Sequence, residues 1–181
     1  LESPKMDAIL SIHCWPDLDV GTVGVGAGPA MAGSMAFRIT MKGVSSHTAM
    51  PQKGRDALLG AAEVISSVHH IIPRRIDPTE MVAIGIGYIE GGSKLGTVAN
   101  RTVMEGSIRA TSKQTLDFVM DRIRDTVEGV SRILDLGNEV SVEGVYPPVM
   151  NDAALNDTVT AAANELLGAD KVIPQPKCPG T

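Results

Sequence analysis

Residues 34–43, SMAFRITMKG, alternate apolar and polar side chains, and this stretch decides the fold. One face collects apolar side chains and the other polar ones: Met35, Phe37, Ile39 and Met41 against Arg38, Thr40 and Lys42. A period of two residues is typical of a strand with one buried face. Gly43 ends the predicted strand, and a polar loop over 44–54 follows it.

An amphipathic helix is predicted after this loop. Its apolar residues recur at alternating spacings of three and four, which places them on one side of a helix; they are Leu58, Ala61, Ile65, Val68 and Ile72. Pro73 is expected to end the helix, because proline lacks the N–H that continues it.

Three further strands and a second helix complete the pattern. Residues 80–90 predict a strand with Val82, Ile84, Ile86 and Tyr88 on one face, and a third strand is expected near 101–110. Ser112 is the predicted N-cap of a helix with a buried stripe, which Gly137 stops; the stripe is Leu116, Val119, Ile123, Val127, Val130 and Leu134. A fourth strand is expected over 139–145.

The order over 34–145 is therefore β-α-β-β-α-β, the ferredoxin-like pattern of an α+β fold. Two helices are expected on one face of a four-stranded antiparallel sheet, giving a two-layer sandwich.

The flanking segments read differently. Residues 7–15 predict a short buried strand that Pro16 stops. Residues 16–33 predict a connector with a short strand at 22–25. A third helix is expected over about 152–167, capped by Asn151 or Asp152 and stopped by Gly168. The closing KVIPQPKCPGT is an apolar stretch for which the sequence offers no partner. The sequence therefore predicts a chain of three parts, with boundaries at 1–32, 33–146 and 147–181. Since the chain opens with Leu1, its natural start is expected to be missing.

Composition excludes several functional classes. The net charge is −5, without the basic cluster that a nucleic-acid surface needs. No apolar run approaches the roughly 18 residues of a membrane span. Aromatic residues make up 3% of the chain, so aliphatic residues and nine methionines must form the core. Cys14 and Cys178 are isolated, which argues against a disulfide scaffold and favours the cytoplasm.

Two histidines could carry chemistry. His13 stands at the end of the predicted strand 7–15, where an imidazole can bind a metal; the alternative is a packed histidine bonded to a carbonyl. His47 lies in the loop KGVSSHTAMP, where it could donate a hydrogen bond to an oxyanion; the alternative is a solvated loop histidine. His69 and His70, at the end of the first helix, are interpreted as structural.

Arg109, in GSIRAT, could bind a carboxylate with its guanidinium. It could equally be a solvated strand residue or a partner for Glu105. The glycines at 91–92 indicate a tight turn, and GVGAG at 24–28 is no dinucleotide fingerprint.

Four runs, in this order, resemble one enzyme family. They are SIHCWPDLDVGTVGVGAGPAMAGS (11–34), FRITMKGVSSHTAMPQKGRDAL (37–58), VMEGSIRAT (103–111) and VIPQPKCPGT (172–181). They resemble the aminoacylase-like metallopeptidases, a group of hippurate hydrolases, N-acyl-amino-acid amidohydrolases and auxin-conjugate hydrolases. The second run resembles the opening of that family's dimerisation (lid) domain.

The resemblance implies a role for each candidate. His13 matches a metal-ligand histidine that closes a two-metal site, and His47 a lid histidine that stabilises the oxyanion in the partner subunit's active site. Arg109 matches an arginine that holds the substrate carboxylate. Gly96 stands where the family has a substrate-contacting asparagine; Asn100, four residues displaced, is the candidate to replace it.

The resemblance also implies what a longer parent would contain. The family's Cys-Gly-His-Asp motif, catalytic Glu and C-terminal metal His are not in these residues. The parent is expected to hold two divalent ions (zinc, manganese, cobalt or nickel), to hydrolyse N-acyl amino acids or related amides, and to dimerise through the lid; this chain alone is expected to bind no metal and to be inactive.

Two alternatives belong to other functional classes. The chain could be a non-catalytic ferredoxin-like module that binds a ligand, or a purely structural dimerisation module.

Overall fold

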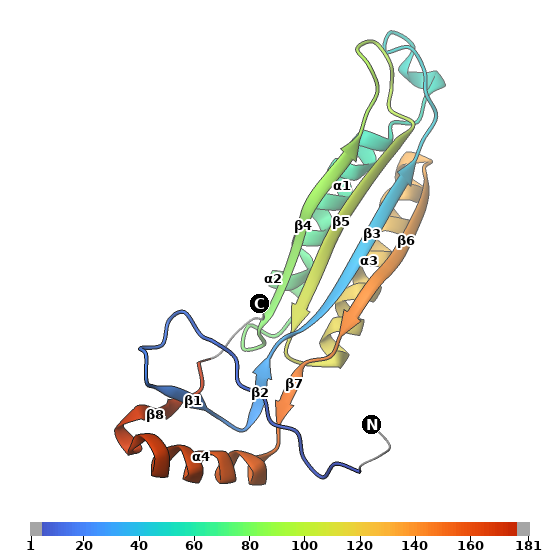
Figure 1. Ribbon diagram of the computed structural model, residues 1–181. Helices are drawn as coiled ribbons and strands as arrows, with labels where there is room; N and C mark the ends of the chain where they lie inside the picture. Colours follow the sequence, from blue (N-terminus) through green and yellow to red (C-terminus); the bar gives the residue numbers. More distant parts are fainter. Residues whose placement is uncertain (1–4, 177–181) are drawn as a thin grey trace. The chain divides into compact units, whose positions relative to one another are not determined.

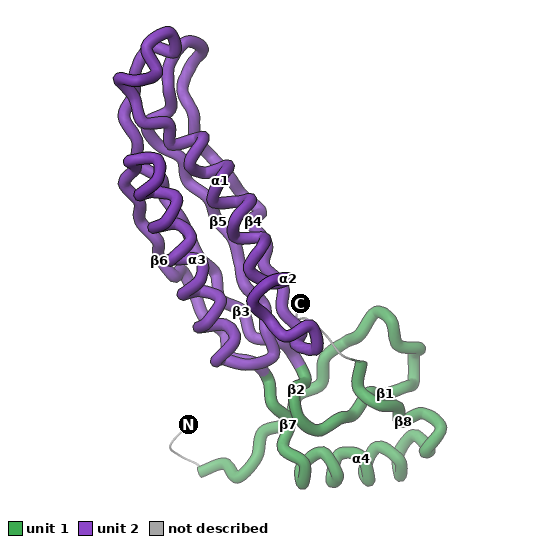
Figure 2. The backbone as a smooth tube through the Cα atoms, turned by 180° about the vertical axis from the view of Figure 1, so that it is seen from behind, with its two compact units in different colours: residues 1–30, 149–178 green, residues 31–148, 179–181 purple. Residues whose placement is uncertain are grey.

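The computed structural model describes residues 5–176. The chain divides into two compact units, shown in Figure 2. Among the described residues, one unit joins 5–30 with 149–176, and the other is Met31–Pro148. Each unit has its own fold.

The larger unit confirms the predicted β-α-β-β-α-β order. Its elements are β3 (Gly33–Lys42), a 3-10 turn η1 (Pro51–Lys53), α1 (Ala57–His69), the short helix α2 (Ile71–Arg75), β4 (Val82–Gly91), β5 (Arg101–Ala110), α3 (Lys113–Leu134) and β6 (Gly137–Tyr146). The strands form one antiparallel sheet in the order β4-β5-β3-β6. Both long helices cover the same face (Figure 1). The fold is thus the expected α+β two-layer sandwich.

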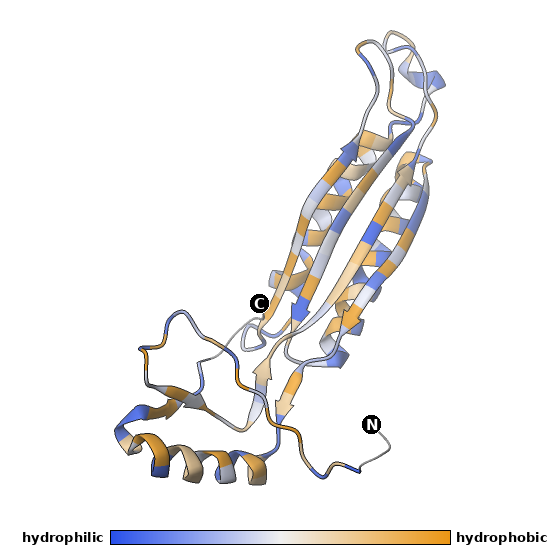
Figure 3. Ribbon diagram, viewed as in Figure 1, coloured by the Kyte–Doolittle hydropathy of each residue, from blue (hydrophilic) through white to orange (hydrophobic). Residues whose placement is uncertain are grey.

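The core fills the space between the helices and the covered face of the sheet. All four apolar residues predicted for the inner face of β3 are buried, and Phe37 is the aromatic residue among them. The strands carry alternating hydrophobic and hydrophilic residues (Figure 3). Aliphatic residues and methionines supply the rest of the core, as the composition required: Ala57, Ala61, Val64, Val68, Met104, Ile108, Leu116, Val119, Met120, Ile123 and Val127.

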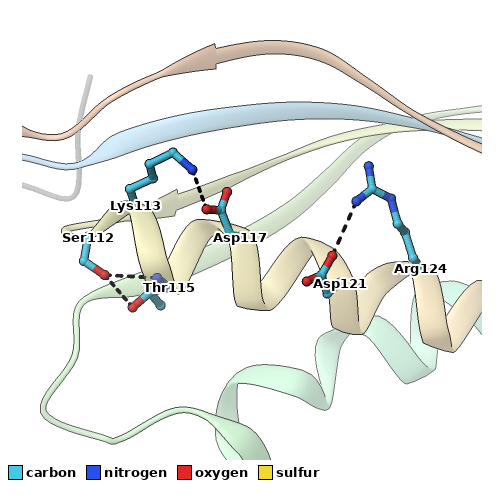
Figure 4. Close-up of polar contacts among 6 residues, drawn as sticks. All are labelled: Ser112, Lys113, Thr115, Asp117, Asp121 and Arg124. Atoms are coloured by element: carbon cyan, nitrogen blue, oxygen red, sulfur yellow. Dashed lines mark hydrogen bonds and ion pairs between the residues drawn. The ribbon is translucent and has the colours of Figure 1, made fainter.

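The start of α3 is as predicted. The Ser112 hydroxyl oxygen accepts the backbone N–H of Thr115 at 3.0 Å, which satisfies one of the free amides of the first turn. Ion pairs such as Lys113–Asp117 and Arg124–Asp121 line the exposed side of the helix (Figure 4).

The end of α3 differs from the prediction that Gly137 stops it. Asp135 adopts the left-handed conformation, with φ 56°, and the Leu136 N–H donates to the Ser131 carbonyl at 2.8 Å. Aspartate tolerates this conformation better than most side chains do. Gly137 instead opens β6.

The predicted apolar stripe of α1 is only half right. Ala61 and Val68 are buried, but Leu58 is 45% exposed and Ile65 is half-buried, while Val64 takes a core position. Pro73 does not end α1, which stops at His69. It lies inside α2, in a first turn whose N–H groups have no partner within the helix.

The prediction that Tyr88 shares one face of β4 with Val82, Ile84 and Ile86 is wrong. The register of β4 against β5 shifts between Ile86 and Tyr88, so that Gly87 is an extra residue. Such a bulge turns the following side chains to the other face. The Tyr88 hydroxyl lies on the open face and donates to Glu90 at 2.8 Å, and this bond raises the pKa of Tyr88.

The smaller unit holds β1 (Val23–Val25), β2 (Gly28–Met31), β7 (Val149–Asn151), α4 (Ala153–Leu167), η2 (Ala169–Lys171) and β8 (Val172–Pro174). Asp152 caps α4 and Gly168 ends it, as predicted. The closing apolar stretch does have a partner, because β8 pairs in parallel with β1. Cys178 lies outside the described residues.

The strand predicted at 7–15 is wrong: these residues have no regular secondary structure, and all but Trp15 are exposed. An apolar run becomes a strand only where a neighbouring strand satisfies its backbone, and none within 5–176 pairs with it. Among the described helices, none is long and apolar enough to cross a bilayer.

Gly106 on β5 offers a test of the packing. A Cβ there would lie 2.5 Å from the carbonyl oxygen of Gly85 and 2.5 Å from the Phe37 ring. Gly106→Ala should therefore lower the free energy of unfolding by about 2 kcal/mol, the usual cost of an overfilled core. Gly85→Ala is the matched control, since its Cβ meets nothing within 4 Å. Urea denaturation checks both; equal stability of the two variants would contradict this packing.

Candidate functional site

The loop that carries His47 is closed at its base by backbone hydrogen bonds. Val44 and Arg55 exchange two bonds, each of 2.9 Å, and the Gly43 N–H donates to the Asn100 carbonyl at 2.8 Å. Gly43 is needed here, because a Cβ at this position would lie 2.0 Å from the Arg55 carbonyl oxygen. Backbone hydrogen bonds therefore hold the base of the loop in place between the end of β3, the start of α1 and the start of β5.

The tip of the loop lies beside a second loop, the connection between β4 and β5. The Val98 N–H donates to the Ser46 carbonyl and the Thr48 N–H to the Gly96 carbonyl, both at 2.9 Å. Between these bonds His47 and Thr97 form an antiparallel bridge. His47 thus sits on a short two-stranded ladder, and its side chain is exposed.

The local backbone sets the tautomer of His47. The Ala49 N–H donates to His47 Nδ1 at 3.1 Å, so Nδ1 is the acceptor. In a neutral imidazole the other nitrogen then carries the proton. His47 therefore presents Nε2–H as a hydrogen-bond donor, the group that can stabilise a negatively charged oxygen.

His13, in the smaller unit, has the opposite arrangement. Its Nδ1 lies 2.6 Å from the Cys14 carbonyl oxygen, which can only accept, so Nδ1 carries the proton. The lone pair of the neutral ring is then on Nε2. Trp15 packs against the ring edge to face, with centroids 6.0 Å apart. An imidazole whose second nitrogen donates to a carbonyl is typical of metal ligands.

His13 alone does not make a metal centre. Within residues 5–176 no three His, Cys, Asp or Glu side chains lie close enough to hold an ion together. The donor chemistry of His13 fits one position of a metal site, and the remaining ligands would have to come from elsewhere.

Arg109 and His47 lie at opposite ends of the larger unit. Arg109 is half-buried near the end of β5, opposite Ser34 and Ala83, whereas the His47 loop adjoins the start of that strand at Arg101. Arg109 lies eight positions after Arg101 on this strand, a separation of about 26 Å at 3.3 Å per residue. Glu105, the alternative partner considered for Arg109, pairs with Arg38 at 2.7 Å.

Asn100 lies at the base of the His47 loop. Its carbonyl accepts from Gly43, and its side chain is exposed. Gly96, four residues earlier in the β4–β5 loop, lies beside the tip of the His47 loop and has φ 89°. The contribution of the Gly96 turn was missed in the sequence; its signal is the Lys94-Leu95-Gly96-Thr97 run, with glycine at the third turn position.

Comparison with known proteins relates this chain to a family. The model of the peptidase dimerisation domain of M20 peptidases matches residues 30–132, more than half of the chain. N-acetyl-L-cysteine deacetylase of Bacillus subtilis is 31% identical over 160 residues, covering 88% of this chain and 38% of that protein. N-acetyldiaminopimelate deacetylase of Lacticaseibacillus casei is 30% identical over 156 residues, covering 85% of this chain and 41% of its own.

Solved structures agree. A dinuclear metal-binding M20 peptidase of Bacillus subtilis superposes with a TM-score of 0.73 at 25% identity, covering 93% of this chain and 41% of that one. A putative aminohydrolase of Staphylococcus aureus has a TM-score of 0.81 at 19% identity over 92% of this chain and 43% of that one, which supports the fold. The chain spans about two-fifths of the length of these relatives. It belongs to the M20 peptidase family of hydrolases and contains the family's dimerisation domain.

Proposed function

We propose that residues 33–146 are the lid of a metal-dependent amidohydrolase that acts on N-acyl amino acids or related amides, and that 1–32 and 147–181 belong to its catalytic domain. The observation that carries this proposal is the exposed His47 imidazole with Nε2–H as donor on a fixed loop. The deacetylase names of the relatives support an amide substrate.

His13 would supply one ligand, through Nε2, to a pair of divalent ions. Zinc, manganese, cobalt and nickel all suit such imidazole and carboxylate sites. When bound, the metal pair would polarise the scissile carbonyl and make water nucleophilic near neutral pH. The dinuclear site named for the Bacillus subtilis structure supports two ions. A cytoplasmic location is part of this proposal, and the exposed free thiol of Cys14 is consistent with it.

His47 would act on the oxygen of that carbonyl. As the carbonyl is attacked, negative charge gathers on its oxygen, and a fixed N–H donor stabilises the charge more than it stabilises the neutral substrate. The imidazole would serve the active site of the partner subunit, because the dimerisation domain carries it.

Arg109 and Asn100 are proposed to contact substrate, with Arg109 holding the carboxylate. A separation of about 26 Å along β5 exceeds the length of an N-acyl amino acid. If His47 and Arg109 both contact substrate, the two residues of one subunit therefore serve different active sites.

His47→Ala, in the full-length protein that carries this chain, should lower kcat by about 10²- to 10³-fold, the usual loss of an oxyanion donor. Metal content and unfolding midpoint should stay unchanged. His70→Ala, which removes another exposed histidine, is the control. Steady-state kinetics and metal analysis check this; an unaltered kcat in His47→Ala would leave a structural or ligand-binding module as the better description.

We further propose which surface forms the dimer. β4 and β6 are the two edges of the sheet within the described residues. The first part of β4, Val82–Ile86, reads VAIGI and carries no charge, whereas β6 carries Glu139 and Glu143. Charges protect an edge strand from pairing, so β4 is the better edge for adding a second copy.

The exposed flank of α1 on the β4 side supports this choice. Leu59, Glu63 and Ser67 face α3 across a groove, so the opposite flank, with Leu58 and Ile65, faces away from α3. These two residues belong to the predicted apolar stripe and remain exposed or half-buried in the single chain. A two-fold axis beside β4 would bring each flank against its own copy.

Leu58→Lys should dissociate the dimer, because it places like charges at this contact and removes an apolar anchor. Leu59→Lys is the matched control, since Leu59 is 50% exposed but faces α3. Light scattering over a concentration series measures the mass. The assignment fails if Leu58→Lys remains dimeric, or if Leu59→Lys alone becomes monomeric.

A further inference from the structure

We propose that the turn Lys94–Thr97 is the positioning element of His47, and that Gly96 is the residue on which this depends. The inference rests on the proposed role of His47. It goes beyond that role by assigning the geometry of the imidazole to a different loop, which acts on His47 through backbone atoms alone.

The contact between the two loops is made by backbone atoms. Ser46, His47 and Thr48 lie antiparallel to Val98, Thr97 and Gly96, held by the two bonds of 2.9 Å that flank the bridge. Because the N–H of Thr48 is fixed by the Gly96 carbonyl, the peptide that joins His47 to Thr48 is fixed on the side facing the β4–β5 loop.

The imidazole depends on the next peptide along the chain. The Met50 N–H donates to the His47 carbonyl at 2.8 Å and so closes a turn, and within this turn the Ala49 N–H reaches His47 Nδ1. If Thr48 loses its anchor, its φ and ψ are free to change, and the Ala49 N–H moves away from the ring. The ring would then lose both its orientation and its fixed tautomer.

Gly96 can hold its carbonyl in place because its φ of 89° is open to glycine. It follows Leu95 in a turn closed by the Thr97 N–H and the Lys94 carbonyl at 3.2 Å, and this turn needs positive φ at its third position. A Cβ at Gly96 would meet nothing within 4 Å. Replacement by alanine therefore adds backbone strain without a steric clash, which makes it a clean probe.

The same loop contains a matched control. Gly92 has φ 104°, and a Cβ there also meets nothing within 4 Å, but its N–H donates to the Arg101 carbonyl at 3.4 Å and makes no bond to the His47 turn. Gly92→Ala and Gly96→Ala thus impose comparable strain, and only the second lies in the ladder. Gly96→Asn is the rescue variant, since asparagine tolerates the left-handed region.

Amide hydrogen exchange of the 181-residue chain gives a readout that does not depend on activity. Gly96→Ala should speed exchange at Thr48 and Ala49 by about tenfold or more, the factor expected from non-glycine strain at positive φ. Gly96→Asn should exchange more slowly than Gly96→Ala, and Gly92→Ala should match the unaltered chain. Unchanged exchange in Gly96→Ala, or equal acceleration in Gly92→Ala, would overturn the inference.

A double-mutant cycle in the full-length protein tests whether Gly96 acts through His47. Gly96→Ala should lower kcat about tenfold with little change in KM, since small misplacements of a catalytic group have effects of this size. In the His47→Ala background it should cause no further loss. An equal loss in both backgrounds would refute positioning, whereas a normal kcat in His47→Ala would refute the proposed function instead.

Discussion

The central position of β3 is the constraint on which the larger unit depends. β3 is hydrogen-bonded on both sides, to β5 over its whole length and to β6 on the other edge, so a shift of one residue would break both ladders. Its inner face buries Phe37, Ile39 and Met41 beneath the two helices. Its last residue leads into the His47 loop. The packing that fixes the register of β3 therefore also fixes where the loop begins.

Backbone carbonyls and amides give the two histidines different chemistry. A carbonyl beside His13 requires a proton on Nδ1 and leaves Nε2 free to bind a metal. An amide beside His47 requires a lone pair on Nδ1 and leaves Nε2–H as a donor. Each arrangement suits the role proposed for that residue and would hinder the other role. The choice is made by neighbours within two residues in the sequence, so it needs no contact between the two units.

The parts of the fold that could be predicted are those whose periodicity is settled within one element. β3 and α3 are examples, since the predicted apolar residues from Met35 to Met41 and from Leu116 to Val127 are all buried, as their spacing indicated. The failures have tertiary causes. One extra residue at Gly87 turned Tyr88 outward, and the absence of a pairing strand within the described residues left 7–15 without regular structure.

The candidate site shows the same division. His47 could be chosen because it lies in a polar loop between a strand and a helix, and because the run around it resembles a known family. Its tautomer and the partner loop could not be foreseen, because the residues of the ladder, Ser46–Thr48 and Gly96–Val98, are about 50 positions apart and pair through backbone atoms that every residue has. The distance between Arg109 and His47 depends on the register of β5 in the sheet, which the sequence pattern does not give.

A single hairpin joins the proposed assembly surface to the proposed chemistry. β4 is the edge whose first part, Val82–Ile86, carries no charge and is proposed to pair with a second copy, and the loop that follows β4 carries Gly96, which anchors the His47 turn. If β4 pairs across a two-fold axis, the hairpin becomes internal to a larger sheet, and its loop loses freedom at the end where Thr48 is bound. A lid of this design would hold His47 most firmly in the dimer, which is also the state that the proposed role of His47 in a partner's active site requires.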